Sequence, residues 1–571
     1  MKNLRAQGPP PGFSLVLVLV TIGVCFLILT GVMLWSSNSG QIALRQTEHY
    51  ATTAAAEAAT EKIVAHISAD FRAGGQARVD NNLGWYPVLV PSATEDAVWN
   101  NYDFLDQAGT PGRAYVNIAT NWHSGPVNWK GANLLGQSAT YRVVATARSS
   151  TTPIPTTAAV LQDLEMIAVP LASFFMFAQP DLELHPSSGS WNVNGPVHAN
   201  ANIYCSPNVA VTFADQVTAT DQILHQRAPG DPLGSGGGTI TYLGAREPGA
   251  GTLKLSLARL PTSAASLWAF CSNHADLRIT IVSSTNLQAV NQAGFDGADL
   301  TNLVWQFLKP QPDGSQGIIA DWRECDVNGW AGPAQRIVAT RFDVNAYQTN
   351  RAALAAHMVG GRPPESVYIH DNRQQTWSRP FYGVEVIGGT TLVAPLTIAT
   401  RQPLYVQGPF NAPFHESSPG STNGAWAAGF IADAVTILSE AWQDANSDEN
   451  LSLGWRNSSP SGTTINAVII TGNVATQEGA YSGGFENLIR LLENWYWGGI
   501  QRRLYINGSL ILPFHSQLAV GEWGQGNVYS APFRVFGFVP YIGATAPIVR
   551  DLEAGMLVRS AWRTTSPGST E

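Results

Sequence analysis

The sequence predicts a mainly β protein with one long N-terminal α-helix. Near the N-terminus, residues 13–35 form an uncharged apolar run, and residues 41–73 continue without proline as a stretch rich in Ala and Glu. Beyond residue 75, short runs of Val, Ile, Thr and Tyr alternate with Gly, Asn and Pro, a pattern typical of strands joined by turns. We therefore expect a helix with a small sheet, followed by a β-helix or solenoid-like domain with covering helices.

The length and charge of the chain limit its class. A chain of 571 residues is too long for one ordinary core, so two or three domains are expected. Charged residues make up only 13%, and the net charge is −9. Because phosphate binding needs clustered Lys and Arg, this acidic chain without a basic run is not expected to bind nucleic acid.

The apolar run at residues 13–35 predicts a membrane-spanning helix. Its 23 residues would extend about 35 Å as a helix, enough to cross a bilayer. Lys2 and Arg5 precede it, and the next basic residue is Arg45, so the N-terminus is expected in the cytoplasm. We expect a single-pass inner-membrane protein with an extracytoplasmic C-terminal region. The alternative, a cleaved secretory signal, is disfavoured because the run is longer than such signals need.

Residues 1–12 form a short basic leader that ends at Gly12, and Phe13 and an aliphatic run follow. This junction resembles the class III prepilin leader of type IV pilins. The resemblance implies that Gly12 and Phe13 flank a processing site cut by a prepilin peptidase. Major pilins carry Glu at the fifth mature position, where this chain has Leu17. In this respect the chain resembles minor or cap-like pilins.

Residues 36–75 are expected to extend the same helix as far as Gly74-Gly75. Ala59, Ile63, Ile67 and Phe71 recur every four residues and give one apolar stripe. The segment YATTAAAEAATEK at residues 50–62 resembles PilX-type minor pilins, in which this half of the helix packs on a sheet. A plain juxtamembrane helix is the alternative.

The pattern of apolar and turn-forming residues divides the remaining chain into regions. Residues 76–180 are expected to form a small pilin-like β head, with its clearest strand at residues 141–147. Residues 181–535 are expected to form the β-rich solenoid-like domain, for which a β-sandwich is the alternative. Within it, residues 425–442 and 484–497 read as covering helices, because their apolar residues recur with helical spacing. The domain plan is 1–12 leader, 13–35 transmembrane helix, 36–75 helix extension, 76–180 head, 181–535 solenoid-like domain and 536–571 C-terminal tail.

Scattered blocks of the β-rich region resemble a family of large envelope proteins that begin with a PilX-like N-terminus. The matching blocks include PDLELHP, NGPVHANANIYCSP, ADWRE, TIATRQPLYVQGPFN, IADAVTILSEAWQDANS and GGFENLIRLLENW. The resemblance implies location and class rather than a mechanism.

Candidate chemistry in the sequence is sparse. His198 and Asn200 share one strand face, but no catalytic partner is identifiable, so a structural role is favoured. The Asp444–Asn450 loop has calcium-loop spacing, but the Gly and Glu that an EF-hand needs at positions six and twelve are replaced, which favours a polar surface loop. The Asp321–Glu324 cluster reads as a salt-bridged turn. The sequence thus predicts no enzyme, no catalytic residue, no cofactor and no metal site.

Three cysteines, Cys205, Cys271 and Cys325, are expected outside the cytoplasm, where disulfides persist. Three thiols allow at most one bridge within the chain, and the sequence leaves the pairing open.

The first functional interpretation is a minor-pilin-like or pseudopilin-like subunit of a type IV pilus or type II secretion-like envelope system. The resemblance implies other pilin-like subunits, the assembly machinery and the prepilin peptidase as partners. The second is a pilin-anchored adhesin or glycan-binding module, suggested by the 18 Trp residues, whose rings stack on sugars. The third is an anchored polysaccharide-degrading enzyme, for which no motif is present.

Overall fold

The structure is a computed structural model of the whole chain. It describes residues 11–129, 132–150, 155–187, 189, 191–249, 263–291, 296–310, 318–321, 336–373, 381–447, 449–451, 454–479, 481, 484–520 and 528–569.

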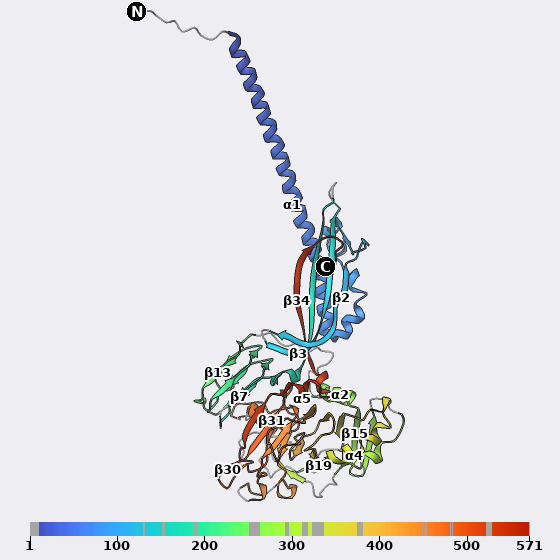
Figure 1. Cartoon of the computed structure of the whole chain (residues 1–571), viewed down its shortest axis with the longest axis vertical. Coiled ribbons are helices and arrows are strands. Elements are labelled where there is room, and N and C mark those ends of the chain that lie inside the picture. Colours follow the sequence, from blue (N-terminus) through green and yellow to red (C-terminus); the bar gives the residue numbers. More distant parts are fainter. Residues whose placement is uncertain are drawn as a thin grey trace, which may run out of the picture.

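A single helix, α1 (Pro11–Asn82), forms the N-terminal part of the chain and projects far beyond the rest of the molecule (Figure 1). This confirms the predicted long N-terminal helix. The helix does not stop at Gly74-Gly75, where the sequence predicted its end, but continues for about two more turns. Val79 in this last part is fully buried, and this packing offsets the low helix propensity of the two glycines.

The second half of α1 packs on an antiparallel sheet of five strands in the described part of the chain. Its strands are β1 (Tyr102–Leu105), β2 (Tyr115–Trp129), β3 (Ala132–Ser149), β4 (Thr157–Pro170) and β34 (Glu553–Thr565). Strands β1 and β2 both pair with β3, and β4 lies between β3 and β34. We call α1 and this sheet the helix–sheet unit.

The fifth strand of this sheet comes from the end of the chain, which corrects the prediction of a tail at residues 536–571. Strand β34 pairs with β4 from Glu553↔Pro170 to Thr565↔Ala159, so the C-terminus lies on the helix–sheet unit (Figure 1). Residues 171–552 are therefore inserted between two adjacent strands of one sheet. We call them the parallel-strand domain.

The parallel-strand domain is built on an 11-stranded sheet, in the order β14-β11-β8-β5-β32-β27-β24-β22-β20-β15-β16 among the described residues. All neighbours pair in parallel except β15 and β16. The strands are β14 (Arg246–Glu247), β11 (Val217–Ala219), β8 (Val197–Ala199), β5 (Met176–Ala178), β32 (Leu510–Leu512), β27 (Val468–Thr471), β24 (Ala428–Ala432), β22 (Leu396–Thr400), β20 (Ser366–Asp371), β15 (Leu277–Ser283) and β16 (Asn286–Asn291).

Shorter sheets lie beside this one and follow the same order of repeats. Two three-stranded parallel sheets combine β6 (Leu182–Leu184), β9 (Ile203–Cys205) and β12 (Ile223–Leu224), and β7 (Trp191–Val193), β10 (Val211–Phe213) and β13 (Ile240–Tyr242). A seven-stranded sheet contains β17 (Leu308–Lys309), β18 (Ile318–Ala320), β19 (Arg336–Asp343), β21 (Phe381–Ile387), β23 (Leu404–Gln407), β25 (Val435–Leu438) and β28 (Ile489–Arg490). The last pieces are β26 (Thr463–Asn466), β31 (Arg503–Asn507) and β33 (Phe533–Gly537), and the hairpin β29 (Tyr496–Trp497) and β30 (Ile500–Gln501).

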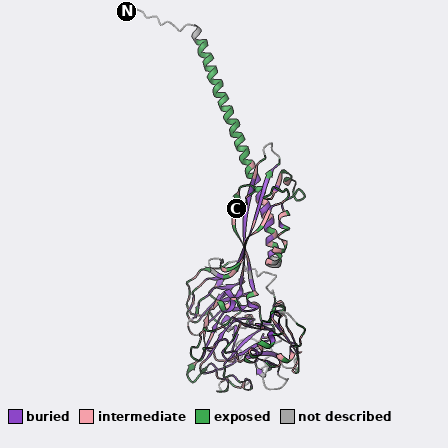
Figure 2. Cartoon of the chain, turned by 45° about the vertical axis from the view of Figure 1, so that its right-hand side comes forward, coloured by how far each residue is buried: buried purple, intermediate pink, exposed green. Residues whose placement is uncertain are grey.

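The chain enters and leaves the parallel-strand domain at its middle. From β5 it builds outward to β14, crosses to the far edge at β15 and returns repeat by repeat to β32, which pairs with β5. The two connections to the helix–sheet unit consequently meet, and Leu171 N donates to Leu552 O at 2.8 Å. Ser509, next to β32, is tied to the first connection, because its Oγ donates to Ala172 O at 2.7 Å. This explains the narrow junction between the two parts in Figure 2.

The two predicted covering helices are wrong. Residues 425–442 contain β24 and β25, and residues 484–497 contain a short 3₁₀ helix, η7 (Phe485–Asn487), and β28. Parallel strands that are buried on both faces read as continuous apolar runs, which resemble buried helices in sequence. The described helices of the domain lie elsewhere: α2 (Ala264–His274), α3 (Thr301–Val304), α4 (Val344–Ala355) and α5 (Pro540–Ala544).

The apolar core follows the same division. Inward-facing Val, Ile, Leu and Phe of successive strands form one large cluster inside the parallel-strand domain, and a separate cluster lies between α1 and its sheet. Figure 2 shows this buried interior in both parts and an exposed helix above them. The prediction of a mainly β chain with a long N-terminal helix is thus confirmed.

Candidate functional site

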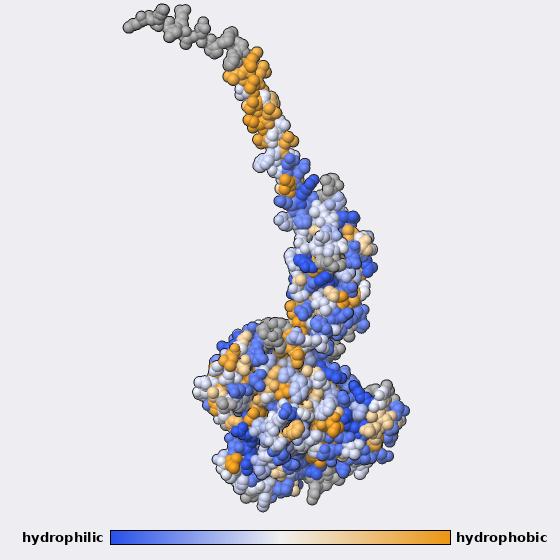
Figure 3. All heavy atoms as spheres, viewed as in Figure 1, coloured by the Kyte–Doolittle hydropathy of each residue, from blue (hydrophilic) through white to orange (hydrophobic). Residues whose placement is uncertain are grey.

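The first half of α1 is the most unusual surface of the protein. Residues 14–46 are exposed, and residues 14–44 contain no charged side chain. The exposed fractions of Phe26, Leu27 and Trp35 are 68%, 75% and 71%. Figure 3 shows the resulting hydrophobic band on the projecting helix. We call residues 14–44 the anchor segment.

The second half of α1 has a different environment. Ala55, Ala59, Ile63 and Ile67 are buried against the sheet, as the predicted stripe requires. Gln162 of β4 donates to Thr60 Oγ1 at 2.8 Å and to Glu61 Oε1 at 2.9 Å.

The last strand of the sheet is also tied to the helix. Arg559 of β34 forms an ion pair with Glu61 at 2.8 Å. Strands from both ends of the chain therefore fix the helix on the sheet.

A buried carboxylate fixes the end of α1. Asp70 accepts hydrogen bonds from Arg78 Nε at 2.8 Å, Asn82 Nδ2 at 2.8 Å and Tyr86 OH at 2.9 Å. Burial alone would raise the pKa of Asp70, but these hydrogen bonds outweigh it and lower the pKa. Burial, together with the hydrogen bond to Asp70, raises the pKa of Tyr86. The helix end is thus held by a charge that stays ionised.

One helix therefore meets two kinds of surroundings. An exposed apolar surface of this size in water is rare unless lipid or other protein covers it. The anchor segment is long and apolar enough to cross a bilayer, and its most apolar window has no buried residue. The helix is thus half exposed and apolar and half packed on a sheet, as predicted from the sequence.

Few known proteins resemble this chain in sequence or structure. No protein-family model matches the chain, and no curated protein matches it. A solved structure with detectable similarity is the competence-associated pilin ComZ from Thermus thermophilus. The two chains are 10% identical, the match covers 91% of this chain and 98% of that one, and the TM-score is 0.24. That score is too low to establish a common fold.

The predicted processing site lies at the start of the helix. Because α1 begins at Pro11, the backbone of Gly12 and Phe13 belongs to its first turn, while residues 1–10 of the leader lie outside the described part of the chain. Leu17 is 60% exposed within the anchor segment. If the anchor segment lies in a membrane, an apolar side chain at this position needs no charged partner there.

The side chains of His198 and Asn200 are engaged in hydrogen bonds within the protein. His198 is fully buried on β8, its Nδ1 lies 2.8 Å from Thr218 Oγ1, and its Nε2 lies 2.8 Å from Asn200 Oδ1. Asn200 also donates to Gln179 Oε1 at 2.8 Å. These contacts join three neighbouring repeats.

The two acidic clusters lie partly outside the described residues. Asp321 is buried, but residues 322–335, with the rest of its cluster, are not described. Asp444 accepts from Arg341 at 2.6 Å and from Trp442 Nε1 at 2.8 Å, so its carboxylate is engaged within the protein. Asp448 of the same loop is not described.

The cysteines within the described residues are free thiols. Cys205 and Cys271 are buried and unpaired with each other, and Cys25 is exposed in the anchor segment. Burial raises the pKa of Cys205 to about 12 and raises that of Cys271 as well. Cys325 lies outside the described part of the chain.

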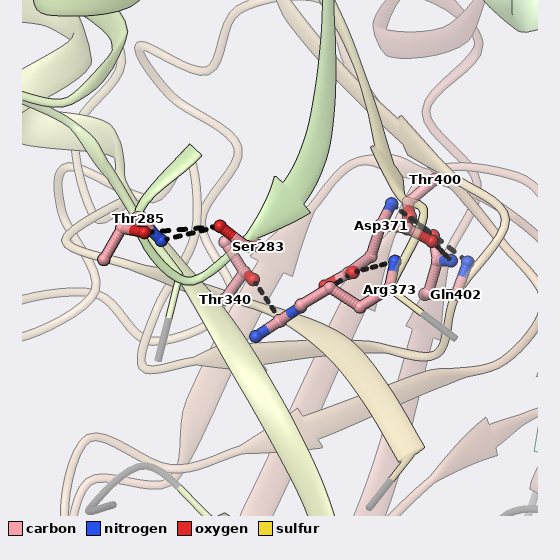
Figure 4. Close-up of polar contacts among 7 residues, drawn as sticks. All are labelled: Ser283, Thr285, Thr340, Asp371, Arg373, Thr400 and Gln402. Atoms are coloured by element: carbon pink, nitrogen blue, oxygen red, sulfur yellow. Dashed lines mark hydrogen bonds and ion pairs between the residues drawn. The ribbon is translucent and has the colours of Figure 1, made fainter. Parts of the chain in front are cut away.

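A buried polar cluster ties strand ends together in the parallel-strand domain (Figure 4). Arg373 forms an ion pair with Asp371 at 2.5 Å and donates to Thr340 Oγ1 at 3.3 Å. Gln402 donates to Asp371 O at 2.8 Å and accepts from Thr400 Oγ1 at 3.0 Å. The members satisfy one another across β19, β20 and β22, which is the pattern of a structural tie.

Other carboxylates are buried at the turns of the domain. Asp433 accepts three backbone N–H groups from residues 517–519, at 2.7–3.1 Å. Glu493 is fully buried and accepts from Ser439 N at 2.5 Å and from Ser439 Oγ at 2.6 Å. Burial raises the pKa of Asp433, and it raises that of Glu493 to about 8.

One cluster of potential metal ligands was not predicted from the sequence. Glu183, His185 and Asp231 place one potential ligand atom each within 4.8 Å of the others. The spacing Glu183-x-His185 was visible within the PDLELHP block. Asp231 lies on a distant loop, and only the stacking of repeats brings it near.

Proposed function

We propose that this protein is a minor-pilin-like structural subunit of a type IV pilus or a related envelope system. The observation that carries the proposal is the division of α1 into an exposed, uncharged anchor segment and a half packed on an antiparallel sheet. In lipid, the anchor segment would hold the subunit. Among other subunits, it would pack into a helical bundle with their anchor segments.

The parallel-strand domain is proposed to be a solenoid-like module carried by the helix–sheet unit. Successive parallel pairings support this proposal, because Met176, Val197 and Val217 occupy equivalent positions about 20 residues apart. Both connections leave from the middle of the domain, so the module can be displayed without interrupting the helix–sheet unit. Its role is structural rather than enzymatic.

The proposed location is the inner membrane before assembly, with both folded parts outside the cytoplasm. Lys2 and Arg5 precede the anchor segment and support this orientation. The proposed partners are other pilin-like subunits, the assembly machinery and a prepilin peptidase. No nucleic acid partner is proposed.

Processing tests the proposal. We expect cleavage between Gly12 and Phe13, which removes the charged leader and leaves an anchor segment that can pass from lipid into an assembly. The measurement is N-terminal mass analysis of the protein from its native membrane. Gly12→Val is expected to abolish cleavage. Gly23→Val is the control, because Gly23 lies on the same helix and an added Cβ there meets no atom within 4 Å.

Two outcomes of this experiment decide the matter. A new terminus at Phe13 in the native chain and in Gly23→Val, but not in Gly12→Val, supports a pilin-like subunit. An intact leader in all three proteins would leave a simple signal-anchored envelope protein and refute the pilin proposal.

A second candidate function, glycan or surface binding, is favoured by one feature. The hairpin β29–β30 presents Tyr496, Trp497 and Ile500 to solvent with exposed fractions of 55%, 45% and 55%. Aromatic faces of this kind stack on sugars. The hairpin lies at the end of the parallel-strand domain away from α1 (Figure 1), where a displayed binding surface would be expected.

A further inference from the structure

The side chains of Glu183, in strand β6, and of His185, the residue that follows the strand, point toward a common space. Leu182 and Leu184 are buried inside the parallel-strand domain, so the alternate positions Glu183 and His185 face the other side. The loop between β12 and β13 brings Asp231 over them, and one ligand atom of each residue lies within 4.8 Å of the others.

His185 distinguishes this cluster from an ordinary group of carboxylates, because it is a buried polar side chain without a hydrogen-bond partner among the described residues. It is only 3% exposed, and among the described residues neither ring nitrogen has a hydrogen-bond partner. Its Nε2 lies 3.5 Å from Glu183 Oε2. Leaving a buried polar group unsatisfied costs about 1–3 kcal/mol, so this imidazole needs a partner. A cation between His185 and the carboxylates would supply one.

The two carboxylates are already oriented by neighbours. Thr476 Oγ1 donates to Glu183 Oε2 at 2.7 Å, and Leu233 N donates to Asp231 Oδ1 at 2.8 Å. Arg227 Nη1 donates to Asp231 Oδ2 at 2.8 Å. Each carboxylate oxygen has two lone pairs, so these contacts fix the groups and still leave positions for a metal.

We propose that Glu183, His185 and Asp231 bind one divalent transition-metal ion, for which Zn²⁺ is the best match. One imidazole nitrogen and two carboxylate oxygens suit Zn²⁺, whereas Ca²⁺ and Mg²⁺ prefer sites made of oxygen alone. Tetrahedral zinc with bonds of about 2.0–2.1 Å places its ligands about 3.3 Å apart. His185 Nε2 and Glu183 Oε2 are already close to this separation, at 3.5 Å, and the ligand atom of Asp231, within 4.8 Å of both, would move closer on binding.

The cluster borders, at His185, a cavity of about 240 Å³ that is also lined by Tyr481 and Glu486. A cavity of this size holds water. The Arg227 guanidinium donates to Asp231 Oδ2 and packs over the Tyr481 ring, 5.1 Å from its centre. Two carboxylates and one guanidinium leave a net charge of −1, which attracts a divalent cation.

The ion would join strand β6 to the loop that carries Asp231, about 45 residues further along the chain. Both segments also contact later repeats, because His185 N donates to Glu486 Oε2 at 3.1 Å and Gly479 N donates to Gly230 O at 3.0 Å. Metal binding would therefore fix this loop on β6 beside the repeats after residue 463, a stabilising role that is independent of the pilin proposal.

The test uses the full chain in detergent, free of affinity tags and stripped of metal with a chelator. We expect titration with Zn²⁺ to show one tight site per chain, with a dissociation constant of about 1 µM or lower. His185→Gln should weaken this site at least about tenfold. Zn²⁺ should also raise the melting temperature of the native chain and not that of the variant. Co²⁺ should give the visible absorption of four-coordinate cobalt in the native chain alone.

The control is His357→Gln, because His357 forms a partly exposed pair with Asp296 at 2.9 Å far along the chain. It should bind Zn²⁺ as the native chain does. If His185→Gln does not fold, Glu183→Gln tests the same site, since its amide can keep the contact with Thr476. Absence of a tight site in the native chain, or equal Zn²⁺ affinity in the native chain and the site variants, would overturn the proposal.

Discussion

Glu493 predicts an unusual dependence of stability on pH. The perturbation is Glu493→Gln, which keeps the shape of the side chain but stays neutral at every pH. Its amide oxygen can accept from Ser439 N, whereas Ser439 Oγ already accepts from Ala441 N and Ser459 N and cannot also accept from the new NH₂ group. The loss of that contact is the same at every pH, so the change with pH in the difference between the two proteins isolates the ionisation.

The magnitude follows from the pKa. Burial, which outweighs the hydrogen bonds from Ser439 and the charge of Arg456, raises the pKa of Glu493 from its ordinary 4.5 to about 8. A raised pKa in the folded state gives stability that is fully present below pH 4.5 and is lost as pH rises through about 8. The loss is about 1.4 kcal/mol per pH unit, or about 3 kcal/mol by pH 7 and on the order of 5 kcal/mol by pH 8.

The assay is denaturant unfolding of the full chain in detergent between pH 5 and pH 9, followed by tryptophan fluorescence. Trp495, two residues from Glu493, is fully buried and reports on this region. We expect the stability of Glu493→Gln relative to the native chain to rise progressively as the pH increases from 5 to 8. Glu440→Gln is the control, because Glu440 is exposed nearby and should follow the native chain.

Other buried carboxylates contribute to both proteins and cancel in the comparison. Burial raises the pKa of Glu385 to about 7, and this adds a decline of its own in the same pH range. The decisive quantity is therefore the difference between the native chain and Glu493→Gln. If this difference does not change between pH 5 and pH 8, Glu493 ionises normally in the folded protein and the reasoning fails.

Two further predictions concern the ends of the molecule. Deleting residues 553–571 should expose the edge of β4 and remove the Arg559–Glu61 ion pair. Limited proteolysis should then cut the helix–sheet unit much faster. Deleting only residues 566–571, which leaves β34 in place, should not change the rate of proteolysis. Trp497→Ala should reduce glycan binding on an array at least about tenfold while changing stability by less than about 0.5 kcal/mol, and Trp562→Ala, equally exposed on β34, should leave binding unchanged. Unchanged proteolysis in the first case, or unchanged binding in the second, would refute the respective prediction.

Local patterns predicted the helix well. The apolar run at residues 13–35 and the four-residue spacing of Ile63 and Ile67 are properties of adjacent turns, and the structure places the first in an exposed helix and the second in a packed interface. The end of the helix was placed too early, because Gly74-Gly75 weakens a helix locally but packing of the following turns compensates.

Residues 425–442 and 484–497 were misassigned for a different reason. A strand buried on both faces has no polar side, so its sequence lacks the alternation that identifies strands. Ala428–Ala432 and Val435–Leu438 are stabilised by neighbours in parallel sheets that lie 30 or more residues away in the chain. That contribution is invisible in a local window.

The sequence by itself determined the anchor segment, the packed stripe that follows it and the mainly β character of the rest, because hydrophobicity and spacing are properties of neighbouring residues. Only the tertiary structure decided that β34 completes the sheet begun by β3 and β4, and that Asp231 meets Glu183 and His185. Pairing between strands and convergence of side chains depend on how repeats stack. Segments almost 400 residues apart become neighbours when the chain enters and leaves its largest domain at one point.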